Sequence, residues 1–240
     1  MPDLRRRPPP AWTQPLLDRL TPTVRNLIIA VTLGYFFLVL APAANGWMIA
    51  HLFLGPGLFH GEVWQLVTGL FLHVRFTAWI FSVIGLWWVG AFVERVKGQR
   101  FFLGVFFGAG IAANLVAALA SLALSGAAGA ARSDGAAFAL TATFVAFARI
   151  YGARPAQIWG AFSMRADYFT GILIGFSLLL ALVNRDFAGF LAEVTAIAVA
   201  FAATGPLKVS SLFPTLSRTG RAKARYRVLD GGKRPPNRPN

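Results

Sequence analysis

Residues 76–93 read FTAWIFSVIGLWWVGAFV, an apolar stretch without a single charged side chain. Arg75 precedes the stretch, and Glu94 and Arg95 follow it directly. A helix needs about 20 predominantly apolar residues to cross a hydrocarbon core about 30 Å thick. The stretch therefore predicts a membrane-spanning helix that is bounded by charged residues on both sides.

The composition of the whole chain fits a membrane protein. Hydrophobic residues make up 56% of the 240 residues and charged residues 13%, about half the usual charged share. The 22 Phe and 7 Trp residues, against 9 Asp plus Glu, present more apolar surface than a soluble domain of this size can bury. The composition thus excludes a soluble globular domain. The absence of Cys also excludes disulfides, thiol catalysis and thiolate metal sites.

Five more apolar segments predict further membrane-spanning helices. They cover residues 26–44, 101–124, 135–148, 168–183 and 187–205. We therefore expect an all-α membrane protein, a bundle of six transmembrane helices in a core of residues 26–206. A cytoplasmic segment, residues 1–25, precedes this core. A basic, proline-rich tail, residues 207–240, follows it and is expected to be disordered.

The distribution of positive charge predicts the orientation of the bundle. If the segments cross the membrane alternately, only Arg75, Arg132 and Arg185 among the 23 Lys and Arg residues fall on one side. Cytoplasmic loops carry the excess of Lys and Arg, so both termini are expected in the cytoplasm. The net charge of +14 lies mainly in loops and tails, which excludes a nucleic-acid-binding fold built around a basic face. The tail is instead expected to contact anionic lipid headgroups.

A functional site is expected near the start of the fourth segment. Residues 135–148 make about 21 Å of helix, which is too short to cross a bilayer unaided. The segment must begin below the membrane surface, where irregular backbone is tolerated only inside protein or around a wet cavity. The first outer loop, residues 45–66, has no Lys or Arg and many aromatic residues. We expect this loop to lie in the membrane interface.

The stretches GEVWQLVTGLFLH (61–73) and GLWWVGAFVER (85–95) resemble the rhomboid family of intramembrane serine proteases. Rhomboids have an interfacial first loop with a Trp-Arg pair, and a Phe-Leu-His sequence that leads into the second span. Their second span ends with a Gly, three residues and a Glu, as Gly90 and Glu94 do here. The resemblance covers residues 27–205 and implies the six-helix rhomboid core.

The resemblance also assigns catalytic positions, and this chain departs from the family at each of them. Active rhomboids place a nucleophilic Ser at the start of the fourth helix and a His base on the sixth helix. Asp134 and Glu193 stand at these two positions here. The two oxyanion residues, four apart on the second span, correspond to Ala78 and Ser82. A shift of the alignment by one residue would make Ser133 the nucleophile.

A serine protease also needs a base that accepts the proton of the nucleophile. The His residues are His51, His60 and His73, all in or next to the first outer loop and none on the sixth segment. Their spacing matches no metal-binding motif, and we expect neither a metal nor another cofactor. The loss of the base and of the oxyanion hole removes several orders of magnitude in rate. The chain is therefore expected to be a rhomboid-fold pseudoprotease.

Asp134 and Glu193 are expected to face each other if the rhomboid packing holds. Two carboxyl groups in low-dielectric surroundings do not both ionise readily, so they share a proton or bind a cation. Four roles remain open for the pair. It could form a structural hydrogen bond between helices, recognise polar groups of a client transmembrane segment, act as an aspartyl-protease-like acid and base, or bind an ion.

The sequence thus predicts a non-proteolytic membrane protein that binds transmembrane segments of client proteins in quality control, trafficking or assembly. Its partners would be such clients and membrane lipid, and its location the cytoplasmic membrane of a bacterium. The residues expected to line the client-binding cavity are Trp64, Ser82, Asp134, Gly135, Glu193 and Thr195. Two alternatives remain: an active rhomboid protease, through Ser133 or an Asp134–Glu193 pair, and a protein that binds protons or cations.

Overall fold

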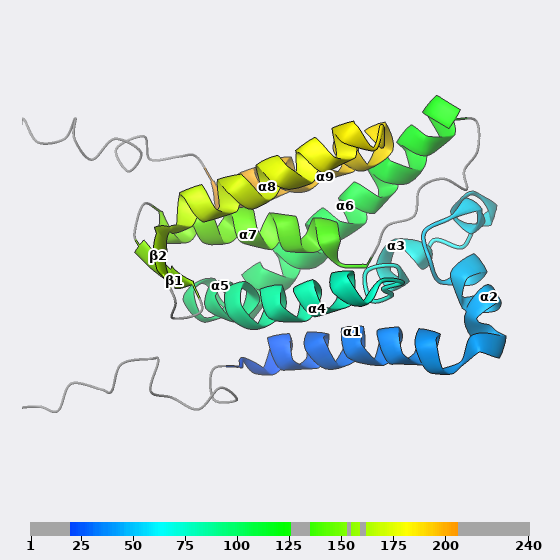
Figure 1. The fold of residues 1–240 in the computed structure, drawn as a ribbon, viewed down its shortest axis with the longest axis horizontal. Coiled ribbons are helices and arrows are strands. Elements are labelled where there is room, and N and C mark those ends of the chain that lie inside the picture. The colour runs from blue at the N-terminus through cyan, green and yellow to red at the C-terminus, as the bar shows by residue number, and fades with distance from the viewer. Residues whose placement is uncertain (1–19, 126–134, 153–154, 159–161, 206–240) are drawn as a thin grey trace, which may run out of the picture. The chain divides into compact units, whose positions relative to one another are not determined.

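The structure, a computed structural model, describes residues 20–125, 135–152, 155–158 and 162–205, and these are mostly helical (Figure 1). In chain order, the elements are α1 (Pro22–Leu40), α2 (Pro42–His51), the 3₁₀ helix η3 (Pro56–His60), α3 (Gln65–Thr68), α4 (Phe76–Gly85), the π-helical turn η4 (Leu86–Gly90), α5 (Ala91–Lys97), α6 (Gln99–Ser125), α7 (Ala137–Tyr151), β1 (Pro155–Ile158), β2 (Phe162–Arg165), α8 (Ala166–Val183) and α9 (Phe187–Thr204).

Within the described residues, five helices are long and apolar enough to cross a membrane. They are α1, the continuous span of α4, η4 and α5 (Phe76–Lys97), α6, α8 and α9. The apolar helix α7 is shorter, with 15 residues, as the sequence predicts for the fourth segment. The prediction of an all-α, multi-pass membrane bundle is therefore confirmed.

Three details of the helical pattern differ from the prediction, each for a local reason. α1 ends at Leu40 instead of near residue 44, because Pro42 begins α2 and disfavours helical backbone at the residue before it. The second span continues to Lys97 and ends at Gly98, which has a φ of 87°. An antiparallel hairpin of β1 and β2, too short to show in the hydrophobic pattern, joins α7 to α8.

The helices α6, α7 and α9 form one core cluster, in which small side chains let the backbones approach closely. The buried alanines are Ala109, Ala113, Ala117 and Ala118 on α6, Ala142 and Ala146 on α7, and Ala192, Ala196 and Ala200 on α9. On α9 the alanines recur every four residues, which places them on one face of the helix. This packing holds α9 in the rotation that turns Glu193 toward α7.

Polar and aromatic contacts at both ends attach α1 to the second span, beside which it runs in Figure 1. At one end, the Tyr35 and Trp79 rings stack with their centroids 5.0 Å apart. At the other end, Glu94 of α5 accepts hydrogen bonds from the Thr21 hydroxyl and from the Val24 N–H at 3.3 Å. The carboxylate therefore caps the start of α1, where the helix dipole favours a negative charge.

α8 lies at the periphery of the bundle. Only 11% of this span is buried, against 50% of α6. Its most exposed large side chains are Tyr168, Ile172, Phe176, Leu179 and Val183. Their spacing is that of one helix face, so this face is directed toward lipid. The inner side of α8 contacts the second span through the rings of Phe169 and Trp88, whose centroids are 5.4 Å apart.

Candidate functional site

α7 begins against the imidazole ring of His73, a residue of the loop between α3 and α4. Gly135 has a φ of 68°, and a Cβ atom on it would lie 2.2 Å from His73 Nε2, so only glycine fits. The N–H of the next residue, Ala136, donates to the same Nε2 atom at 3.4 Å. This contact supplies an acceptor for an N–H group at the helix start, where no intrahelical partner exists.

Ser82 on α4 is the second partner of this ring. Its Oγ lies 2.8 Å from His73 Nε2, and both side chains are buried. A backbone N–H can only donate, so Nε2 is an acceptor that carries no proton, and the Ser82 hydroxyl donates to it as well. The prediction included Ser82 but missed His73, because the approach of His73 to α7 depends on how the preceding loop folds.

Glu193 on α9 forms a separate polar centre. Its carboxyl is buried, and Oε1 accepts a hydrogen bond of 2.8 Å from the Thr141 hydroxyl on α7. Ser177 on α8 also interacts with this carboxyl. Thr141 lies about 7 Å along α7 from Ala136, so this centre is distinct from the His73 contact. The carboxyl links α7, α8 and α9.

The remaining predicted catalytic positions are described only in part. Asp134 and Ser133 lie outside the described residues, so the expected approach of Asp134 to Glu193 stays a prediction. Ala78 is half-buried on α4, one turn before Ser82. Among the side chains that the structure describes, no group of three or more His, Asp or Glu residues could hold a metal ion.

Two other residues expected at a client cavity form local hydrogen bonds. The Thr195 hydroxyl donates to the Leu191 carbonyl oxygen of its own helix at 2.8 Å. Trp64 is about half exposed, and its indole N–H donates to the His51 carbonyl oxygen at 2.8 Å. The polar groups of both side chains are therefore occupied by nearby backbone.

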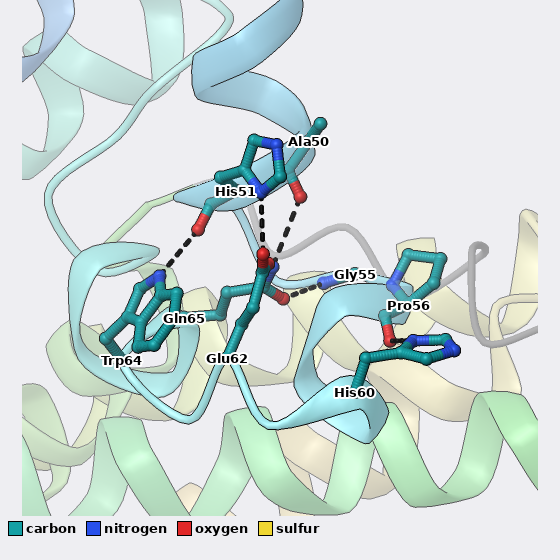
Figure 2. A network of polar contacts seen from close by, with 8 residues as sticks. All are labelled: Ala50, His51, Gly55, Pro56, His60, Glu62, Trp64 and Gln65. Carbon is teal, nitrogen blue, oxygen red and sulfur yellow. Dashed lines mark hydrogen bonds and ion pairs between the residues drawn. The ribbon is translucent and has the colours of Figure 1, made fainter.

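A polar network holds the first loop together (Figure 2). The Gln65 side chain is fully buried: its Oε1 accepts from the Gly55 N–H at 2.9 Å, and its Nε2 donates to the Ala50 carbonyl oxygen at 3.2 Å. The same Nε2 donates to Glu62 Oε2 at 2.5 Å. The other oxygen of Glu62 lies 2.6 Å from His51 Nδ1. Gln65, which stands where rhomboids have Arg, is thus the centre of the loop, a role that the sequence pattern does not reveal.

A family model and two similar proteins all assign this chain to the same protein family. A model of the rhomboid domain matches residues 60–210, more than half of the chain. The chain is 31% identical over 98 residues to the putative rhomboid protease YdcA of Bacillus subtilis (strain 168), over 40% of this chain and 49% of that protein. It is 38% identical over 55 residues to the rhomboid protease GluP of the same organism, over 23% of this chain and 11% of that protein. The chain thus spans half or less of the length of these relatives. By the domain match and the helical bundle, the chain belongs to the rhomboid family.

Proposed function

We propose that this rhomboid-family protein binds transmembrane segments of client proteins without cleaving them. The observation that carries the proposal is Glu193, whose carboxyl occupies the face of α9 that meets α7. By the family resemblance, a serine protease would have an imidazole there, to take and return a proton. A buried carboxyl that already engages Thr141 and Ser177 is suited instead to hydrogen bonding within apolar surroundings.

α8 provides the route by which a client helix would arrive. It is the least buried of the candidate spans and meets the second span through the Trp88–Phe169 ring contact. Separation of α8 from the second span would let a helix in the lipid approach Ser177 and Glu193. A client with a polar residue near its middle would find a hydrogen-bond partner there, worth about 1 kcal/mol in a membrane.

Two model clients test this proposal, both single-span Leu-rich helices that differ only in one central Asn. We expect the Asn helix to bind the reconstituted protein several-fold more tightly, as measured by energy transfer between labelled helix and labelled protein in liposomes. Glu193→Met should remove the difference, whereas Glu62→Gln in the first loop should retain it. Equal affinity for the two helices would contradict the proposal.

Proteolysis is the second candidate function, and one specific observation favours it. The Ser82 hydroxyl donates to an unprotonated His73 Nε2 at 2.8 Å, which is the geometry of a nucleophile beside its base. The similar proteins from Bacillus subtilis are named as rhomboid proteases. Under this hypothesis a fluorophosphonate probe labels the protein, and Ser82→Ala abolishes labelling. Labelling that is lost only in Ser133→Ala would assign the nucleophile to Ser133 instead.

We also propose that the protein resides in the cytoplasmic membrane of a bacterium. The origin of the two similar proteins in Bacillus supports this location. The basic composition of residues 207–240 supports contact of that segment with anionic lipid headgroups. The contact of residues 207–240 with anionic lipid is tested by vesicle binding. The full chain and a chain ending at residue 206 are compared on vesicles with and without an anionic lipid.

A further inference from the structure

A cavity with a mainly apolar lining lies where α1 begins and α5 gives way to α6. Its volume is about 390 Å³, within the range of small-ligand sites. The lining includes the polar side chains of Asn26, Glu94 and Gln99 and the apolar ones of Leu27, Ala30 and Phe71. Asn26 and Gln99 are exposed, so the cavity opens on the surface of the bundle. Because membrane-spanning helices begin and end near the headgroups, this opening lies at headgroup level.

Glu94 brings a negative charge to this cavity. The residue is only 8% exposed. Its Oε2 atom accepts both hydrogen bonds from the start of α1, from the Thr21 hydroxyl and the Val24 N–H. The other oxygen, Oε1, accepts no hydrogen bond from the described residues, so it has capacity for a donor in the cavity. A buried carboxylate is stabilised by a cation or by further donors.

The surroundings of the cavity carry the opposite charge. Arg25 on α1, Arg95 and Lys97 on α5, and Arg100 on α6 are all exposed at this end of the bundle. A carboxylate inside a cavity with cations around it complements a zwitterion whose ammonium group enters first and whose phosphate stays at the rim. The apolar lining by Leu27, Ala30 and Phe71 accommodates the hydrocarbon attached to such a headgroup.

We propose that this cavity binds the headgroup of phosphatidylethanolamine from the surrounding membrane. The primary ammonium donates to Glu94 Oε1 and to the amide oxygens of Asn26 and Gln99, and the phosphate lies among the flanking Arg and Lys side chains. A primary ammonium has three N–H donors for these acceptors. The quaternary ammonium of phosphatidylcholine has none, so the site discriminates between the two lipids.

Native mass spectrometry of the full chain in mild detergent tests this proposal by titration with lipids of identical acyl chains. We expect one phosphatidylethanolamine to bind about tenfold more tightly than phosphatidylcholine, since charge-assisted hydrogen bonds form only with the former. Glu94→Gln keeps an acceptor for the start of α1 but removes the charge, and should reduce the affinity to that for phosphatidylcholine. As a control, Glu62→Gln removes a carboxylate from the first loop, away from this cavity. It should leave the preference for phosphatidylethanolamine over phosphatidylcholine unchanged.

Two further variants avoid the contact between α5 and α1. Asn26→Leu and Gln99→Leu change exposed side chains at the rim, and each should lower phosphatidylethanolamine affinity several-fold without altering phosphatidylcholine binding. Equal binding of the two lipids by the unaltered protein would overturn the proposal. So would a preference that survives Glu94→Gln. Tighter binding of phosphatidylglycerol than of phosphatidylethanolamine would also overturn it, because the flanking cations alone would then explain lipid retention.

Discussion

Gly135 is subject to two restrictions, a φ of 68° and the ring of His73 packed against its Cα. We expect Gly135→Ala to be strongly destabilising, since strain and overpacking act together. The matched comparison is Gly152→Ala, because Gly152 also has a φ of 68° but nothing in the described part of the chain lies within 4 Å of its Cβ position. Gly135→Ala should lower the free energy of unfolding by about 2 kcal/mol more than Gly152→Ala.

Denaturant unfolding in mild detergent, followed by circular dichroism, measures this difference. The Gly152 variant reports backbone strain alone, about 1–3 kcal/mol. Equal losses for the two variants would show that the contact of His73 with the start of α7 does not constrain this position.

Gln65 should determine the order of the first loop. Gln65→Leu removes the side-chain partners of the Gly55 N–H and the Ala50 carbonyl, and an unsatisfied buried group costs about 1–3 kcal/mol. Amide hydrogen exchange should therefore accelerate in the loop around Gly55 and stay unchanged in α6. Gln99→Leu, at an exposed position, is the control that should leave exchange in the loop unaltered. Unchanged protection of the loop in Gln65→Leu would refute the role of this network.

At the scale of elements, α6 carries glycines of two kinds. A Cβ on Gly110 would lie 2.9 Å from Leu70 Cδ2 and 3.2 Å from Ala139 Cβ, whereas a Cβ on Gly108 meets nothing within 4 Å in the described residues. Gly110→Ala should therefore destabilise the bundle by about 1–3 kcal/mol through overpacking. Gly108→Ala should stabilise the helix by about 0.5–1 kcal/mol. Thermal unfolding of both variants in one detergent should show a lower midpoint for Gly110→Ala and a higher one for Gly108→Ala. Midpoint shifts of the same sign would contradict the distinction between the two glycines.

The peripheral helix α8 should be the element that moves most readily, because few of its side chains are buried. Phe169→Ala removes its ring contact with Trp88 and should accelerate hydrogen exchange in α8. If a client helix enters beside α8, the same variant should also bind the Asn-bearing model helix faster. Phe176→Ala, on the exposed face of α8, is the matched control that should change neither quantity. Equal effects of the two substitutions would argue against opening at this contact.

For the whole molecule, hydrophobic periodicity and length predict most of the fold. The last span is expected at residues 187–205 and is observed as α9, Phe187–Thr204, because the boundaries of an apolar helix in a membrane follow from composition. The predicted end of the first span is wrong, and the sequence pattern does not predict the β-hairpin. The end of α1 depends on the backbone restriction at Pro42. The hairpin consists of two strands of four residues each, which are too short to give a hydrophobic pattern.

The candidate site could be predicted only in part. Family motifs place Ser82 on the second span and Glu193 on the sixth. Spacing in the sequence does not specify how each helix is rotated or how a loop returns to the bundle. The contact of Ser82 with His73 and that of Glu193 with Thr141 both arise from this tertiary arrangement. The absence of a His on the sixth segment was visible in the sequence, whereas the His73–Ser82 pair was not.

The absence of proteolysis is the central claim, and the fate of an intact client tests it most directly. The purified protein is reconstituted in liposomes with a labelled single-span client that carries a central Asn, and the mass of the client is measured over time. The account predicts that the client stays at full length and co-purifies with the protein. Cleavage within the membrane-spanning segment, lost in Ser82→Ala, in Ser133→Ala or in the Asp134→Ala and Glu193→Ala pair, would contradict the account.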